Sequence, residues 1–230
     1  MINRKRKALS LLLAVVMIFT IWMLPNGKAY VDAASLTGKQ RALRAYKEFL
    51  SKPTVPIIPV GKRYYNLDRC MVEYYTATPS SQVRFSLAYI NNDNIPELIV
   101  ERMEECWRHG LYGVFTYKNG KVTRLRSGGG EDYYIGCYTK TGTFLTRMIT
   151  EGTPYNDHYT VFKNGKVTKR LIKSVMSSKE ITYYKYRNGH FPIVSKSSFM
   201  SAFRYYTKGK SLTKASFHKN AAWSRNMYLK

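Results

Sequence analysis

The stretch YINNDNIPELIV, residues 89–100, concentrates oxygen-bearing side chains in a short segment. Asn91, Asp93 and Glu97 can offer amide and carboxylate oxygens to a hard cation such as calcium. The alternative is a polar turn in which Asn91 and Asp93 bond their own backbone. The residues alone leave both interpretations open, and calcium is the one cofactor that they suggest.

This segment resembles the strand-loop-strand stretch of integrin-type FG-GAP repeats and of dockerin-like calcium loops. Their common bacterial form reads Asp-Ile-Asn-Gly-Asp-Gly-x-Pro-Glu-Leu. Aligned on residues 96–98, Asn91 and Asp93 stand at the second and third ligand positions. Tyr89 stands where the first Asp would be, and Asn94 replaces a glycine. The resemblance therefore implies a calcium loop whose ligand set is incomplete.

A broader resemblance covers most of residues 34–230. The segments RALRAYKEFL, PELIV, YKNGKV and the basic end RNMYLK are similar to those of uncharacterised secreted proteins from Gram-positive, clostridia-like bacteria. The resemblance implies secretion and brings no particular activity with it.

Two acidic pairs stand out on a basic chain, Glu104-Glu105 and Glu131-Asp132. A glycoside hydrolase needs two carboxylates that face each other across a cleft, so a carbohydrate-active hydrolase is an alternative function. The same acids would also serve as salt-bridge partners for the surrounding Lys and Arg. Because no nucleophile motif and no metal-ligand spacing of histidines accompanies them, the sequence favours a non-catalytic protein.

The charge of the chain indicates its class of partner. The 230 residues hold 38 Lys and Arg against 14 Asp and Glu, a formal net charge of +24. Such an excess favours polyanions through long-range steering and counterion release. Expected partners are anionic cell-wall polymers, glycans or a membrane surface, with nucleic acid only as a nonspecific polyanion.

The predicted polyanion-binding residues lie in the C-terminal tail and at the ends of two hairpins. In the alternative, the tail packs its aromatic side chains on a sheet and shows its cations to water. The candidate residues are Lys208, Lys210, Lys214, Lys219, Trp223 and Arg225 in the tail, and Lys118, Lys121, Lys163 and Lys166 in the hairpins.

The N-terminus has the order of a secretory signal peptide: four basic residues, an apolar run over residues 8–24 and small residues before residue 34. The alternative is an uncleaved membrane anchor. Without residues 1–33, which hold five basic residues and one acid, 33 basic and 13 acidic residues remain. Cys70, Cys106 and Cys137 are an odd number, so one disulfide with a spare thiol, or three thiols, are both compatible with the sequence.

These residues require elements that position them. Residues 37–51 have the apolar spacing of an amphipathic helix, and three Asn-Gly pairs between apolar, β-branched segments predict type I′ hairpins. Residues 195–207 again have helical spacing. We therefore expect an α+β, mainly β protein built on one antiparallel meander. The expected parts are a signal peptide (1–33), an N-terminal helix with a Pro-rich connector (34–62), an antiparallel β domain (63–194) and a helical basic tail (195–230).

Overall fold

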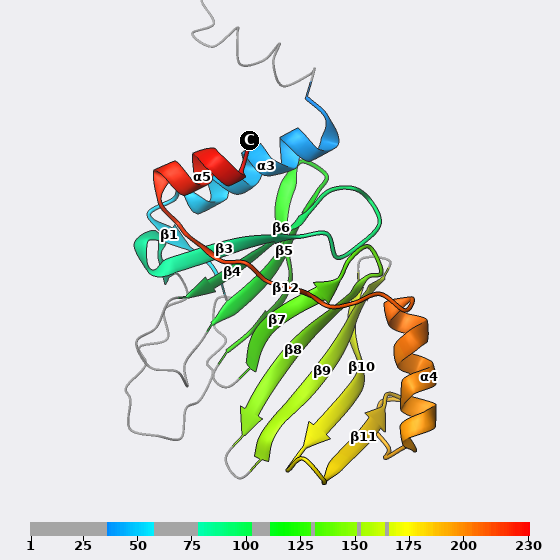
Figure 1. Ribbon diagram of the computed structural model, residues 1–230. Coiled ribbons are helices and arrows are strands. Elements are labelled where there is room, and N and C mark those ends of the chain that lie inside the picture. Colours follow the sequence, from blue (N-terminus) through cyan, green and yellow to red (C-terminus); the bar gives the residue numbers. More distant parts are fainter. Residues whose placement is uncertain (1–35, 58–77, 103–110, 130–131, 151–152, 164–165) are drawn as a thin grey trace, which may run out of the picture. The chain divides into compact units, whose positions relative to one another are not determined.

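Figure 1 shows the computed structural model, which describes residues 36–57, 78–102, 111–129, 132–150, 153–163 and 166–230. The expected signal peptide and the residues Cys70 and Cys106 lie outside these ranges. The described part is mostly β, arranged in antiparallel sheets, with three α-helices. None of the described helices has the length and apolar character needed to cross a membrane.

The chain divides into two units, residues 1–41 and residues 42–230. The described part of the first unit holds the start of helix α3, which runs over Gly38–Leu50. The Thr37 hydroxyl accepts a hydrogen bond from the Gln40 backbone N–H at 3.2 Å, and the Gln40 side chain accepts one from the Thr37 N–H at 2.9 Å. This reciprocal capping box satisfies two backbone donors and sets the start of the helix.

In the second unit, five strands form one sheet in the order β13-β3-β4-β5-β6. One face of this sheet packs on the second unit's part of α3, where Phe49 contacts Phe115 with ring centroids 4.9 Å apart. A two-stranded sheet and a 3-10 turn lie between α3 and β3 along the chain. The bounds are β1 Thr54–Val55, β2 Thr78–Pro79, η1 Ser80–Gln82, β3 Val83–Ala88, β4 Glu97–Arg102, β5 Tyr112–Lys118, β6 Lys121–Gly128 and β13 His218–Lys219.

Six further strands form a second sheet in the order β11-β10-β9-β8-β7-β12. Its bounds are β7 Asp132–Tyr138, β8 Thr143–Thr150, β9 Thr153–Lys163, β10 Lys166–Val175, β11 Ile181–Lys185 and β12 Thr213–Lys214.

Both faces of the six-stranded sheet are covered. Tyr134 and Phe144 pack on the five-stranded sheet. On the opposite face, Tyr159 and Leu171 pack on Phe199 of helix α4, which runs over Lys196–Thr207. The orange helix in Figure 1 lies alongside these strands.

The hairpin predictions are confirmed where the structure describes the turns. Asn119 and Gly120, between β5 and β6, have φ of 52° and 77°, as a type I′ turn requires. Asn188 and Gly189 also have positive φ, of 49° and 89°, but residues 186–195 after β11 form two isolated bridges and not the second strand that was predicted. Strands β9 and β10 pair as expected, and the Asn-Gly pair at 164–165 lies outside the described residues.

The expectation of one continuous meander is wrong, because β6 and β7 do not pair and the strands divide between two sheets. An Asn-Gly turn specifies the pairing of its own two strands. It carries no information on which hairpins then join edge to edge.

The expectation of a helical tail over 195–230 is wrong in its middle part. After a turn at 208–209, residues 210–221, here called the strap, are extended, and a third helix, α5, follows at Ala222–Tyr228. The strap adds β12 beside β7 of one sheet and then β13 beside β3 of the other (Figure 1). Gly136 permits this approach, since a Cβ there would lie 2.2 Å from the Thr213 carbonyl oxygen.

Asn220 fastens the end of the strap. Its side-chain amide donates to the carbonyl oxygens of Leu50 at 2.8 Å and Ser80 at 3.0 Å, and its own oxygen accepts from Arg225 at 2.8 Å. One side chain therefore joins the end of α3, the turn η1 and helix α5 within the second unit.

We expect Asn220→Ala to lower the free energy of unfolding by roughly 1–3 kcal/mol, because it removes the side-chain donor to the Leu50 carbonyl oxygen and the acceptor of Arg225, while the Ser80 carbonyl keeps the Val83 N–H. Urea denaturation of the purified chain measures this. Asn226→Ala is the matched control, because Asn226 is exposed on α5. Equal stability of the two variants would contradict the role given to Asn220.

Candidate functional site

A hollow of about 780 Å³ lies between the β9–β10 hairpin and the C-terminal end of α4. We call it the cationic groove. Its described lining residues are four cations, two tyrosines and three others, and none of these nine is an acid. They are Lys163, Lys166, Arg170 and Lys208; Tyr205 and Tyr206; and Thr141, Val161 and Thr168.

Strand alternation brings the hairpin residues to one face. Lys163 pairs with Lys166, and Val161 pairs with Thr168, so all four side chains point to the same side of the sheet. The register then shifts between Lys169 and Leu171. This bulge leaves Arg170 on the groove side and lets the next residue, Leu171, join the core under α4.

The end of helix α4 supplies the other side of the groove. The Thr143 hydroxyl donates to the Tyr206 carbonyl oxygen at 2.8 Å and holds this helix end to the sheet. Lys208 is the C-cap in the left-handed conformation, where its cation is favourable beside the negative end of the helix dipole. Tyr205 is 74% exposed and forms an edge-to-face pair with Tyr206.

The cationic groove concentrates positive charge, and no acid among the described residues neutralises it. Lys163 and Lys166 are directly opposed across the hairpin, a placement of like charges that costs stability. Among the described residues, none of the four groove cations makes an ion pair with an acid. A bound anion would relieve this repulsion, so the arrangement suits an anionic ligand.

The groove gathers Lys163, Lys166 and Lys208 from the ten residues predicted to bind polyanions. Lys118 and Lys121 face each other at the end of the β5–β6 hairpin in the other sheet. The remaining five belong to the strap and to α5.

The strap and α5 use several of their polar groups to hold the fold. The Lys210 ammonium donates to the Thr139 carbonyl oxygen at 2.9 Å, and Arg225 bonds Asn220. Lys214 and Lys219 lie in β12 and β13, and Trp223 is 63% exposed on α5. The strap is therefore a structural connection on which Lys214 and Lys219 are exposed. The exposure of Trp223 differs from the alternative interpretation of the tail, in which its aromatic side chains pack on a sheet.

Sequence reasoning missed Arg170, Tyr205 and Tyr206. Arg170 becomes a groove residue through a bulge that leaves no mark in the amino-acid pattern. The two tyrosines belong to a helix whose spacing indicated only a core face. Their exposure follows from where the helix ends on the sheet.

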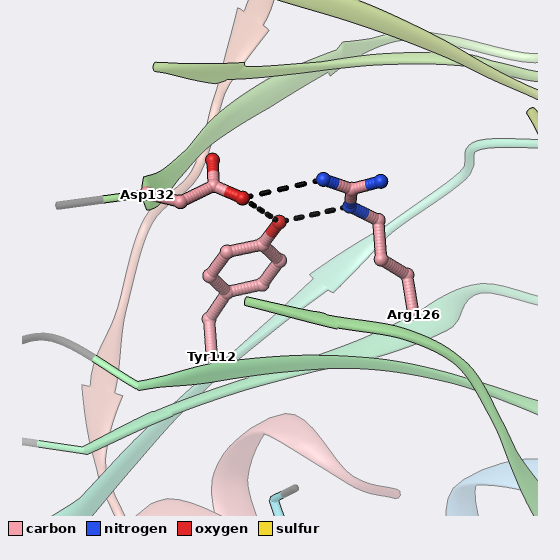
Figure 2. Close-up of polar contacts among 3 residues, drawn as sticks. All are labelled: Tyr112, Arg126 and Asp132. Atoms are coloured by element: carbon pink, nitrogen blue, oxygen red, sulfur yellow. Dashed lines mark hydrogen bonds and ion pairs between the residues drawn. The ribbon is translucent and has the colours of Figure 1, made fainter. Parts of the chain in front are cut away.

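Among the four acids considered for hydrolysis, Asp132 is described, and it ties the two sheets together (Figure 2). Its Oδ2 accepts from the Tyr112 hydroxyl at 3.1 Å and from Arg126 at 3.2 Å, while Arg126 Nε donates to the same tyrosine oxygen at 3.0 Å. Asp132 is 7% exposed. These contacts give it a structural role, and Glu104, Glu105 and Glu131 lie outside the described residues.

His158 lies on the same buried face of the six-stranded sheet. Burial, with Lys169 as the next cause, lowers the pKa of His158 to about 4, so the ring is neutral near pH 7. A buried neutral histidine between two sheets is consistent with a packing role.

The loop at residues 91–97 is closed by its own hydrogen bonds. The Asn91 side-chain oxygen accepts from the Asp93 N–H, and Asp93 accepts from the Ile95 N–H, both at 2.9 Å. These are the Asx turns of the alternative interpretation. The Asn91 amide nitrogen also donates to Asp93 at 2.9 Å and to Glu97 at 2.8 Å, so two carboxylates converge on it.

Glu97 is fully buried at the start of β4 and accepts the Ile90 N–H at 2.9 Å. Burial raises the pKa of Glu97 to about 7. Within the described residues, no group of three His, Cys, Asp or Glu side chains forms a metal site. The expected calcium ligands are Asn91, Asp93 and Glu97, and the amide of Asn91 is not one of these side-chain types. Calcium binding at this loop therefore stays a prediction.

No protein-family model matches the chain, and no curated protein or solved structure is significantly similar to it.

Proposed function

We propose that the chain is a non-catalytic binding protein for anionic polymers at the cell envelope, and that the cationic groove is its binding surface. The supporting observation is the convergence of four cations from two strands and a helix end on one hollow that has no acid among its described lining residues. The volume of about 780 Å³ falls within the roughly 300–1,000 Å³ of typical ligand sites. The signal-peptide pattern of residues 1–33 supports the extracellular location.

The mixture of side chains favours a flexible, repeating anion. Lysines act as adaptable point charges, whereas recognition of a single fixed phosphate or carboxylate favours the paired donors of arginine. Three of the four groove cations are lysines. The excess positive charge over the whole chain would raise the rate of encounter with such a polymer.

Binding to immobilised heparin tests this proposal. We expect the chain to elute above physiological salt. The triple variant Lys163→Ala/Lys166→Ala/Lys208→Ala should bind roughly 3- to 100-fold more weakly, because each exposed ion pair contributes about 0.2–1 kcal/mol. Affinity is measured at fixed salt by titration with heparin.

The chain offers its own matched control. The sequence KNGK occurs in both hairpins, at residues 118–121 and 163–166. Lys118→Ala/Lys121→Ala/Lys214→Ala removes the same charge outside the groove. Elution of the wild type at or below physiological salt would contradict the proposal, as would an equal loss of affinity in the two triple variants.

A second candidate function is a calcium-stabilised structural domain. The observation in its favour is the convergence of the Asp93 and Glu97 carboxylates on one point in the loop. A calcium ion there would need the Asn91 amide to turn and offer its oxygen, and it would need Glu97 in the charged form.

The pKa of Glu97 gives this candidate a pH dependence. Because the folded-state pKa of about 7 lies above the ordinary carboxyl pKa of 4.5, the contribution of Glu97 to stability is present below pH 4.5 and is lost as the pH rises through 7. Calcium competes with that proton. We therefore expect calcium to raise the melting temperature more at pH 8 than at pH 6, and Asp93→Asn to reduce the rise.

The measurement is a thermal melt with calcium or with chelator at constant ionic strength. Asp93→Asn keeps the oxygen that accepts the Ile95 N–H, and it removes the charge together with the oxygen that accepts the Asn91 amide N–H. Identical melting temperatures with calcium and with chelator at pH 8 would identify the loop as a polar turn.

A further inference from the structure

A second hollow, of about 160 Å³, lies beside α4 on the same face of the six-stranded sheet. We call it the aromatic pocket. Four aromatic side chains, one methionine and one lysine line it: Tyr159, Tyr183, Phe199, Phe203, Met200 and Lys173.

The rings of the aromatic pocket support one another. Tyr183 and Phe199 lie 4.8 Å apart between ring centroids, and Tyr159 meets Phe203 edge to face at 5.3 Å. These contacts fix the ring positions without filling the space between them. Tyr183, Met200 and Phe203 are only partly buried, so the pocket wall is accessible to solvent.

The aromatic pocket and the cationic groove are neighbours on the same elements. On β9, Tyr159 of the pocket and Val161 of the groove are consecutive residues of one face, about 7 Å apart along the strand. On α4, Phe203 belongs to the pocket and Tyr205 to the groove. A polymer lying in the groove can therefore reach the pocket with an adjoining unit.

We propose that the aromatic pocket binds a sugar ring of an anionic glycan whose acidic groups occupy the cationic groove. This inference rests on the proposed function. The pocket is well below the roughly 300 Å³ of small ligand sites, which suits one ring and not a chain. The negative faces of its rings attract the slightly positive C–H face of a sugar, and Lys173 can bond a hydroxyl or acidic group at the rim.

Polyphosphate is the informative comparison, because it carries anionic charge and no ring. Met200→Trp fills the aromatic pocket from a partly exposed position on α4 and leaves the charge unchanged. We expect this variant to bind a heparin oligosaccharide roughly 2- to 10-fold more weakly than the wild type, since ring contacts are lost. Its affinity for polyphosphate at the same salt concentration should be unchanged.

Met227→Trp is the matched control, because Met227 is exposed on α5 and lies outside both hollows. Tyr183→Leu removes one aromatic side chain from the pocket lining and should also weaken heparin binding without changing polyphosphate binding. With two variants, the test stays decisive if one of them folds poorly. Thermal melts check the folding of each variant.

An unchanged heparin affinity in Met200→Trp and Tyr183→Leu would overturn the inference. An equal loss of affinity for heparin and for polyphosphate would also overturn it. Either result leaves the groove proposal standing if Lys163→Ala/Lys166→Ala/Lys208→Ala still weakens both ligands. If that triple variant binds both ligands like the wild type, the proposed function itself fails.

Discussion

The structure depends on burying both faces of the six-stranded sheet. Its strands carry aromatic side chains on each face, and a sheet of this kind is stable only between two covering layers. Tyr134 and Phe144 are covered by the five-stranded sheet, and Tyr159 and Leu171 are covered by α4. The strap then fixes the two sheets to each other by adding one short strand to each. Much of the tail charge is therefore carried by a segment whose backbone has a structural task.

The cationic groove follows from the same constraint. Helix α4 covers the apolar part of the sheet and ends where the β9–β10 hairpin becomes lysine-rich, so the helix end and the hairpin end enclose a polar hollow. The other KNGK hairpin, at residues 118–121, has the same local sequence and lies in the other sheet. The proposed function thus distinguishes two hairpins of identical local sequence only by what the fold places beside them. The aromatic pocket is a separate hollow beside α4 on the same face of the sheet.

The sequence predicts the local structure well and the assembly poorly. Asn119-Gly120 and Asn188-Gly189 were recognisable as turns because few residues adopt positive φ. The division into two sheets was not recognisable, because side-chain alternation describes one strand and its hairpin partner only. The strap is not predictable from the sequence, because its two-residue strands are too short to show an alternation of apolar and polar residues. Net charge favours polyanions as partners, and this stays a prediction. The meeting of Arg170 with a distant helix end depends on a bulge and on packing that no local pattern encodes.

The central claim is that one hairpin and one helix end, and not the basic surface in general, hold the anion. Lysine acetylation in the presence and absence of a heparin oligosaccharide, read by mass spectrometry, tests it most directly because it compares identical KNGK turns in one molecule. The account predicts that the oligosaccharide protects Lys163, Lys166 and Lys208 and leaves Lys118 and Lys121 reactive. Equal protection of both hairpins would show that binding follows net charge alone and would contradict the account.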